Sequence, residues 1–438
     1  MSTATSHSVL PVAASAGEPA AATSLTLVLA FTAINSLGSG VVTMGISFLA
    51  RSAYGFSDNE NFGLSLVMGL AYIPAAMFAG PALRSIRHRL PWFTTRLALL
   101  ALMLALGATC MLPWTVDLIS NRGPVAGGAR SGAWTMWVVI GLYAALTGAL
   151  WPMVESFMSG GRSGHRLRSS IGVFNIVWSS AVVVGFVAIG PVQAGSPLAV
   201  IAAVGLAHIA SALFLIGFRA DPGRHIHEAH EPHPSRYRGL LEVFRLALPA
   251  GYMVTTALQP YMPTVVERLA IPVWAHTPLA ATWFGTRVLA FAVLERWQGW
   301  HGRWSMPIIG GALILAGFAA AVLSPDLAAA AGRPAGIAAL LAGLGAFGIG
   351  MGTVYAGALY YAMEVGQAEV DAGGTHEALI GVGYVVGPAC GLIAAGGVSA
   401  GVVTQGSFDT TMIGLIMLCT LALATVALLK VRAAIPRR

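Results

Sequence analysis

Arg287 is the residue whose chemistry most constrains the rest of the sequence. It lies near the middle of an apolar stretch at residues 276–296, with Trp283 one helical turn before it. Holding a guanidinium at that depth in lipid costs from about 2.5 to well over 10 kcal/mol, so the side chain must face a protein interior. Two kinds of compensation are open. A protein partner such as Glu267, a backbone carbonyl or an aromatic face would make it structural. A carboxylate or phosphate of a bound molecule, held by the two-pronged guanidinium, would make it a binding residue, and the shortage of carboxylates in the middle of the apolar stretches favours this alternative.

Further polar and aromatic side chains fall inside apolar stretches, where each polar group needs a partner or water. For any single one, a helix–helix hydrogen bond worth about 1 kcal/mol is the simpler interpretation. As a set, they predict a partly hydrated central cavity. The candidate binding residues are Asn35, Trp151, Asn175, Gln259, Tyr261, Trp283, Arg287 and Tyr355.

Glu155 is a candidate gating residue near the end of an apolar stretch, one turn after Trp151. Arg162, Arg166 and Arg168 follow it closely. We favour an ion pair with these arginines over proton coupling, because an acid at a helix end can reach water. A second acidic group is expected in the connector between the tenth and eleventh stretches, as a latch against basic loops, and comprises Glu364, Glu369, Asp371, His376 and Glu377.

Small residues recur at every fourth position in the eleventh stretch, at Gly383, Gly387, Gly391 and Ala395. Such a face lets another helix approach closely, and Pro388 removes one backbone donor from the same helix. The spacing specifies contact and not motion, so static packing and rocking of one helix group against another are both open. The candidate gating or packing residues are Gly80, Arg89, Glu155, Gly383, Gly387 and Pro388.

The elements that must position these residues are membrane-spanning helices. The chain has 438 residues, of which 56% are hydrophobic and 9% charged, too few charges to cover a soluble protein of this length. This argues against soluble enzymes, DNA-binding domains and disordered chains. Because apolar runs of about 20 residues cross a bilayer as helices, we predict an all-α integral membrane protein. The twelve expected spans are residues 24–49, 61–82, 93–113, 134–157, 170–190, 197–218, 246–268, 276–296, 306–323, 335–362, 377–398 and 409–430.

Basic residues predict the orientation of these spans. With both termini inside, 18 Lys and Arg residues fall in inner loops and five in outer loops, and Arg287 is left within a span. This bias predicts an N-in, C-in topology in the inner (cytoplasmic) membrane, so the net charge of +7 is no sign of a nucleic-acid partner. We expect a disordered cytoplasmic tail at 1–23, a six-helix half at 24–218, a cytoplasmic His-rich linker at 219–245, a second six-helix half at 246–430 and a basic tail at 431–438.

No cofactor and no metal site is expected. The linker carries His225, His227, His230 and His233, but exposed histidines without a rigid frame make a weak site, so a solvated linker is the preferred interpretation. The three cysteines fall inside expected spans without ligand spacing. The sequence contains no nucleotide-binding P-loop, and no Ser/His/Asp arrangement can be placed on one face of the bundle, so we do not expect an enzyme.

The chain resembles the major facilitator superfamily of secondary transporters over essentially its whole length. Residues 80–89, which read GPALRSIRHR, are similar to the family signature G-x-x-x-D-R-x-G-R-R in the first glycine and the terminal basic residues. Arg84 stands where the family has Asp, so the charge latch of that signature is not carried over. Further similar stretches are residues 54–57, 151–156, 174–179, 360–361 and 376–388.

The resemblance implies twelve helices in two six-helix halves and a transporter that moves a small solute across the lipid bilayer by alternating access. An anionic solute is the sharper hypothesis because of Arg287, and we further expect a monomer. A non-transporting membrane receptor or scaffold with the same fold is the alternative, and an intramembrane enzyme is a weaker one, because a fold does not determine a function.

Overall fold

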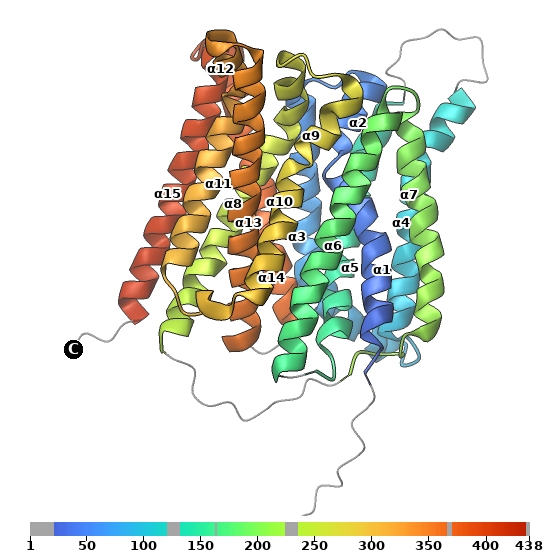
Figure 1. Ribbon diagram of the computed structural model, residues 1–438. Helices are drawn as coiled ribbons and strands as arrows, with labels where there is room; N and C mark the ends of the chain where they lie inside the picture. The colour runs from blue at the N-terminus through green and yellow to red at the C-terminus, as the bar shows by residue number, and fades with distance from the viewer. Residues whose placement is uncertain (1–21, 121–131, 163, 224–234, 366–369, 435–438) are drawn as a thin grey trace, which may run out of the picture.

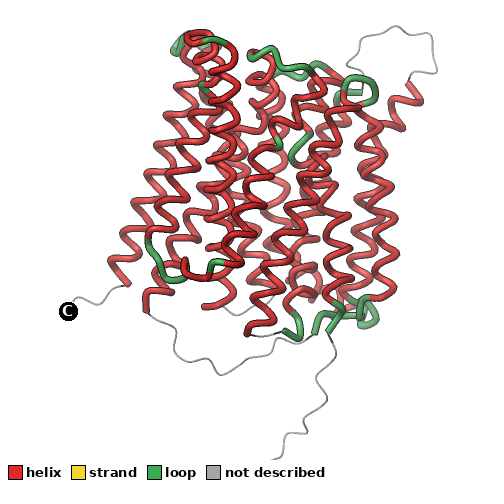
Figure 2. Tube along the Cα trace, viewed as in Figure 1, coloured by secondary structure: helices red, strands yellow, loops and turns green. Residues whose placement is uncertain are grey.

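The computed structural model describes residues 22–120, 132–162, 164–223, 235–365 and 370–434, which form a helical bundle without strands (Figures 1 and 2). Within these residues, eleven helical segments are long and apolar enough to cross a membrane. A twelfth helix, α8 (Ser235–Arg268), is long enough but more polar, and it contains three prolines. The predicted all-α membrane fold is confirmed.

The first half of the bundle contains the spans expected from the first six apolar stretches. Its helices are α1 (Leu25–Gly38), α2 (Ile46–Tyr54), α3 (Asp58–Arg89), α4 (Thr95–Ser120), α5 (Trp134–Ser159), α6 (Gly164–Gln193) and α7 (Pro197–Ser211). A π-helical turn, Ser39–Thr43, extends α1, and a 3-10 turn, Ala212–Gly217, extends α7.

The second half repeats the pattern with two additional short helices. Its helices are α8, α9 (His276–Ala280), α10 (Thr282–Arg296), α11 (Ser305–Val322), α12 (Ser324–Ala331), α13 (Arg333–Val365), α14 (Val370–Ser399) and α15 (Phe408–Ala434). Short 3-10 turns precede α9, follow α10 and precede α15.

The two ends of the bundle are distinguished by the described chain ends. Helix α1 begins and α15 ends at the same end, which we call the proximal end, whereas α2 and α12 lie at the opposite, distal end (Figure 1). Because the described chain starts and ends at the same end, it crosses the bundle an even number of times.

The helices depart from the expected spans where polar residues form helical turns. Helix α3 begins three residues earlier than expected because Ser57 and Glu60 form a capping box, in which each side chain accepts a backbone N–H of the other residue. Helix α8 begins at Ser235, so the last part of the expected linker, residues 235–245, is helical. The linker histidines, the residues 1–21 of the expected N-terminal tail and residues 435–438 of the basic tail lie outside the described residues.

The two halves meet along glycine-rich helix faces. Helix α14 packs against α3, α5 and α8, and α10 packs against α6. A Cβ atom built on Gly383 would lie 2.6 Å from the Cβ of Tyr252 and 2.7 Å from the backbone of α8, and one on Gly387 would overlap the backbone oxygen of Met253. The next glycine, Gly391, instead faces Phe62 of α3. The expected small-residue face therefore serves two neighbouring helices, one from each half.

Candidate functional site

A cavity of about 70 Å³ lies between the two halves. The space is enough for several water molecules, so a larger solute requires the surrounding side chains or the halves to move apart. The first half contributes residues from the π-helical turn and from α3, α5 and α6, and the second half contributes residues from α8, α10, α13 and α14. The lining residues are Ser39, Thr43, Met44, Tyr72, Trp151, Glu155, Phe174, Trp178, Val182, Tyr252, Arg287, Tyr355, Glu377, Ile380 and Tyr384.

Arg287 of α10 is fully buried, and its charge is compensated by aromatic faces and one hydroxyl. Its guanidinium carbon lies 4.5 Å from the ring centroid of Trp178 and 5.0 Å from that of Trp283. Its Nε donates to Oγ of Ser179 at 3.1 Å, across the boundary between the halves. Glu267, one of the possible partners, does not pair with Arg287, because its carboxylate binds Arg51 at the distal end. Of the open alternatives, an aromatic face is the one found.

This compensation leaves part of the guanidinium unused. Both terminal nitrogens, Nη1 and Nη2, are buried without a hydrogen-bond partner among the described residues. Cation–π contacts stabilise a desolvated guanidinium by about 2 kcal/mol, but they do not replace its hydrogen bonds. The two terminal nitrogens of a guanidinium can donate to both oxygens of a carboxylate or phosphate.

Four tyrosine rings line the cavity together with the tryptophans. Tyr384 contacts Tyr72 and Tyr252 edge to face, with centroids 5.4 and 5.5 Å away, and Tyr355 lies 5.4 Å from Trp178. Sequence reasoning selected only Tyr355 of these tyrosines as a binding candidate. The others, Tyr72, Tyr252 and Tyr384, were missed, although a tyrosine hydroxyl well inside a span is a signal of the same kind as the amides and hydroxyls that were selected.

The two glutamates of the cavity differ from what was expected of them, although the side chain of Arg168, one of the expected partners of Glu155, lies outside the described residues. Glu155 is not paired with Arg162, whose guanidinium donates to the backbone oxygens of Phe157 and Met158 at 2.9 and 2.7 Å. Desolvation by burial lowers the pKa of Arg162. Glu377 does not lie in a connector, because α14 begins at Val370 and carries it into the bundle. Hydropathy placed the start of this helix too late, because His376 and Glu377 are polar residues that are nevertheless buried in the bundle.

Glu155 and Glu377 line the same cavity, and the hydroxyl of Tyr72 donates to Glu377. His376, the preceding residue, is also buried, with its ring 5.5 Å from that of Tyr355. The other members of the expected acidic latch have no described side chains.

Asn35 lies away from the cavity. Its amide nitrogen donates to the backbone oxygen of Phe31 at 2.8 Å and to Oγ of Ser211 at 3.1 Å, and its amide oxygen accepts from Nδ1 of His208 at 2.7 Å. The hydroxyl of Tyr143 lies 3.2 Å from the other ring nitrogen of His208. Asn35 is therefore held in a buried network of α1, α5 and α7, the helix–helix bonding that was the simpler interpretation.

The remaining candidates are spread along the interface of the halves. Trp151 and Tyr355 line the cavity, while Trp283 is buried behind Arg287. Gln259 contacts the sulfur of Met44, a cavity residue, across the boundary between the halves. Tyr261 lies at the distal end, where Arg268 donates to its hydroxyl at 3.3 Å.

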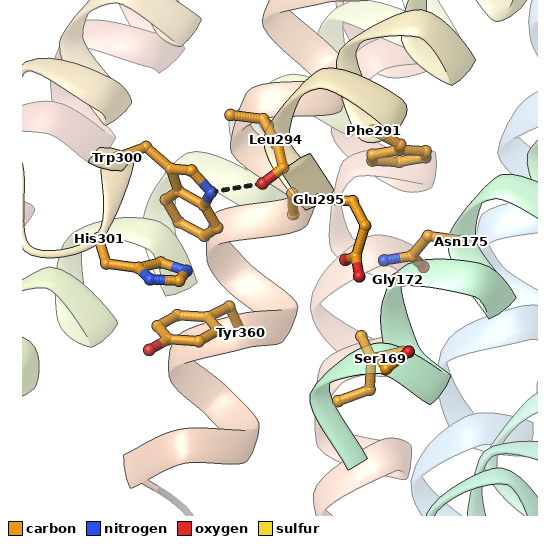
Figure 3. Close-up of a pocket in the computed structure, with 11 residues that line it drawn as sticks. Ser169, Gly172, Asn175, Phe291, Leu294, Glu295, Trp300, His301 and Tyr360 are labelled. Carbon is orange, nitrogen blue, oxygen red and sulfur yellow. Dashed lines mark hydrogen bonds between the residues drawn. The ribbon is translucent and has the colours of Figure 1, made fainter. Parts of the chain in front are cut away.

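Asn175 belongs to a second cavity of about 90 Å³ on the proximal side of the first. Figure 3 shows that Glu295 of α10 points toward Asn175 of α6 and that His301 stacks on Tyr360. The side-chain oxygen of Asn175 accepts from Nε1 of Trp178 at 3.0 Å. Since Trp178 lines the first cavity and Asn175 the second, this hydrogen bond joins a residue of each cavity.

An ion-paired cluster joins the halves at the distal end. Arg51 of α2 binds Asp58 at 2.9 Å and Glu267 at 3.1 Å, and it donates to Oγ1 of Thr264 at 2.6 Å. Thr264 donates in turn to Asp58 at 2.5 Å. Because Arg51 and Asp58 belong to the first half and Thr264 and Glu267 to the second, this cluster holds the distal ends together.

The remaining gating and packing candidates occupy different environments. Gly80 is buried in α3, and Pro388 is buried in α14. Arg89 is exposed in the last turn of α3, at the proximal end.

Sequence comparison with protein-family models and with curated proteins gives no match. Comparison of the structure with solved structures gives matches along nearly the whole chain. The crystal structure of the nucleoside transporter NupG is similar with a TM-score of 0.57 at 11% identity, over 94% of this chain and 99% of that chain. A bacterial homolog to the human lysosomal transporter Spinster, in an inward-facing and occupied conformation, is similar with a TM-score of 0.53 at 14% identity, over 94% and 95% of the two chains.

Both structures are major facilitator superfamily transporters. At these identities the similarity shows the fold, as the sequence motifs predicted. The chain is a multi-pass membrane protein with the twelve-helix fold of the major facilitator superfamily.

Proposed function

We propose that the protein is a secondary transporter that moves a small solute with an anionic group by alternating access. In this proposal the central cavity is the binding site and Arg287 binds the anionic group. The two halves rock about the cavity so that it opens to one side of the membrane at a time.

The observation that carries the proposal is the pair of unpartnered guanidinium nitrogens of Arg287 in a cavity lined by both halves. A hydrogen bond to a charged group is worth about 1.5–3 kcal/mol, which corresponds to about tenfold to 150-fold in affinity. The tyrosine and tryptophan rings around Arg287 favour a solute that also presents a flat or apolar surface. Both structural neighbours are transporters, which agrees with this class of function and does not identify the solute.

The orientation proposed from the basic residues places the proximal end in the cytoplasm of a bacterial-type inner membrane, with both termini inside. The domain limits proposed from the sequence are retained, with residues 219–245 joining two six-helix halves and α8 beginning within that connector. A monomer contains the whole cavity, because both halves belong to one chain.

The test is uptake by the purified protein in proteoliposomes. Labelled carboxylates and phosphate esters are first ranked by their thermal stabilisation of the protein, and the best are then assayed for uptake. Arg287→Lys keeps the charge but loses the two-pronged geometry, so it should lose most substrate affinity while still folding and inserting. Arg245→Lys is the matched control, because Arg245 is exposed and pairs with Glu242 far from the cavity.

Transport of an anionic solute that is lost in Arg287→Lys and kept in Arg245→Lys supports the proposal. Normal transport by both Arg287→Lys and Arg287→Gln, or a substrate that is neutral or cationic, contradicts the anionic site. Binding of a solute without any uptake or exchange favours a receptor over a transporter.

A further inference from the structure

The central cavity contains charged groups of both signs that do not pair with one another. Arg287 comes from α10 of the second half and Glu155 from α5 of the first half, and both line the cavity. Arg287 is fully buried and Glu155 is 5% exposed. Among the described residues, no ion pair joins Arg287 to Glu155 or to Glu377. Each group therefore needs a further partner, because a buried charge is stable only when it is paired and hydrogen-bonded.

Both groups have hydrogen-bonding atoms that the protein leaves unused. Nη1 and Nη2 of Arg287 and Oε2 of Glu155 are buried without a partner among the described residues. A guanidinium offers only donors, and an ionised carboxylate offers only acceptors. Glu377 differs from Glu155, since the hydroxyl of Tyr72 already donates to it. The cavity thus presents two donors from one half and an acceptor from the other half.

The charge balance of the lining disfavours a plain anion. Among the described residues that line the cavity, one guanidinium and two carboxyl groups carry charge, those of Arg287, Glu155 and Glu377. An added anion binds the guanidinium, but it is repelled by the carboxylates, and such repulsion is strong in a protein interior. A solute that also carries an ammonium group has no net charge to be repelled. Its ammonium can donate to the unpartnered oxygen of Glu155.

A chain of ring contacts connects the arginine to the acidic residues. The guanidinium carbon of Arg287 lies 4.5 Å from the ring centroid of Trp178, and the rings of Trp178 and Tyr355 are 5.4 Å apart. The ring of His376, the residue before Glu377, lies 5.5 Å from that of Tyr355. The carbon skeleton of a bound solute can pack against these rings. The cavity volume of about 70 Å³ favours a short skeleton.

We propose that the solute is a small zwitterion, whose anionic group binds Arg287 and whose ammonium group binds Glu155. This solute class rests on the proposed function, because it concerns the same cavity. A zwitterion carries the anionic group that the proposed function requires, which an uncharged solute or a plain cation lacks. Since Arg287 and Glu155 belong to different halves, the bound zwitterion joins the halves across the cavity, whereas a plain anion leaves Glu155 without a partner.

The test compares solutes that share one carbon skeleton. Purified full-length protein is screened for thermal stabilisation by the protein amino acids, β-alanine, γ-aminobutyrate and aminoethylphosphonate. Dissociation constants are then measured by calorimetry for the best of these, for the same skeleton without the amino group and for the same skeleton without the acidic group. The zwitterion should bind at least about tenfold more tightly than either analogue, since each analogue loses a hydrogen bond between charged groups.

Substitution of Glu155 separates recognition of the ammonium group from general damage to the cavity. Glu155→Gln should weaken binding of the zwitterion by at least about tenfold. The deaminated analogue should bind this variant as tightly as the wild type or more tightly, because the variant removes a negative charge and none of the contacts of that analogue. Damage to the cavity would instead weaken both ligands. Arg287→Lys should weaken both ligands as well, because both carry the anionic group.

Glu242→Gln is the matched control for the loss of a carboxylate. Glu242 pairs with Lys430 at 3.2 Å and does not line the central cavity. The variant should therefore bind both the zwitterion and its deaminated analogue with wild-type affinity.

Equal affinity of the wild-type protein for the zwitterion and its deaminated analogue overturns the proposed solute class, and this comparison does not depend on the folding of any variant. Failure of every zwitterion in the screen to stabilise the protein overturns it too. Wild-type zwitterion affinity in Glu155→Gln overturns the assignment of the ammonium group to Glu155. Zwitterion binding with the expected preference but without uptake or exchange counts against the transport function and supports the solute class.

Discussion

Gly387 lies where α14 packs against α8, and enlarging it should separate two helices that build the cavity wall. A Cβ atom at this position would overlap the backbone oxygen of Met253 and Oγ1 of Thr256, and it would lie 2.9 Å from the backbone nitrogen of Ala257. Ordinary contacts of a Cβ atom are 3.4 Å or longer, so α14 and α8 must move apart even for Gly387→Ala.

The cost of Gly387→Ala follows from three contributions. Overpacking of this kind costs about 1–3 kcal/mol. The separation also weakens the hydrogen bond from Thr256 to the backbone oxygen of Gly383, which is 2.9 Å long and worth about 1 kcal/mol. Replacing a helical glycine by alanine returns up to about 1 kcal/mol through backbone entropy. The net expectation is a loss of about 1–3 kcal/mol, with a larger loss for Gly387→Leu.

Gly396 of the same helix provides the control, because a Cβ atom there meets nothing within 4 Å. Gly396→Ala should leave thermal stability unchanged or slightly higher. Thermal unfolding of the purified proteins, followed by tryptophan fluorescence, measures the difference, and uptake assays measure its effect on the cavity. Gly387→Leu should insert into the membrane normally, since leucine raises the hydrophobicity of the span, but should lose transport. Wild-type stability and uptake in Gly387→Leu would refute the packing argument.

Three further predictions concern topology, distal closure and the buried amide. A cysteine at Ser85 should be labelled only from the cytoplasmic side and a cysteine at Asn59 only from the outside, as measured with an impermeant reagent on intact cells; labelling of both from one side would reject the orientation. Glu267→Gln should weaken the distal contact with Arg51 by about 0.2–1 kcal/mol, the usual range for partly exposed ion pairs, and so increase distal opening by no more than about fivefold in spin-label distances. High salt should mimic this effect in the wild type and not in the variant. Asn35→Ala should lower the unfolding temperature through the loss of about 1–3 kcal/mol of buried hydrogen bonding without changing the KM for uptake, and a KM that rises severalfold would return Asn35 to the binding site.

Local composition was sufficient to predict the spans and the interior position of Arg287. A span must be apolar over about 20 residues whatever its neighbours are, so hydropathy identifies it without knowledge of the packing. The same argument requires a mid-span guanidinium to face the protein interior. Even the small-residue face at Gly383 and Gly387 could be identified, because close helix approach needs small side chains at regular spacing.

The partners of these residues were decided by the tertiary structure. Glu155 and Glu377 are separated by more than 200 positions in the sequence, and only the packing of α5 against α14 brings them to the same cavity. The sequence instead suggested nearby arginines for Glu155, because separation along the chain is the only proximity that a sequence displays. Asn35 failed as a cavity residue for the same reason, since its partner His208 lies 173 residues away and a hydrogen bond inside one half cannot be told from a solute contact by residue type.

The sequence by itself determined the membrane class, the number of spans and the need for a polar interior, because these depend on the transfer of each segment from water to lipid. Only the tertiary structure decided which polar groups share a cavity, which bond to one another and which keep unpartnered donors. Those outcomes depend on how each helix is rotated and on the contacts between the halves. The hydropathy of a single helix carries no information on either. Arg287 shows both sides: its burial is a consequence of its place in the sequence, and its two unpartnered nitrogens are a consequence of the helices around it.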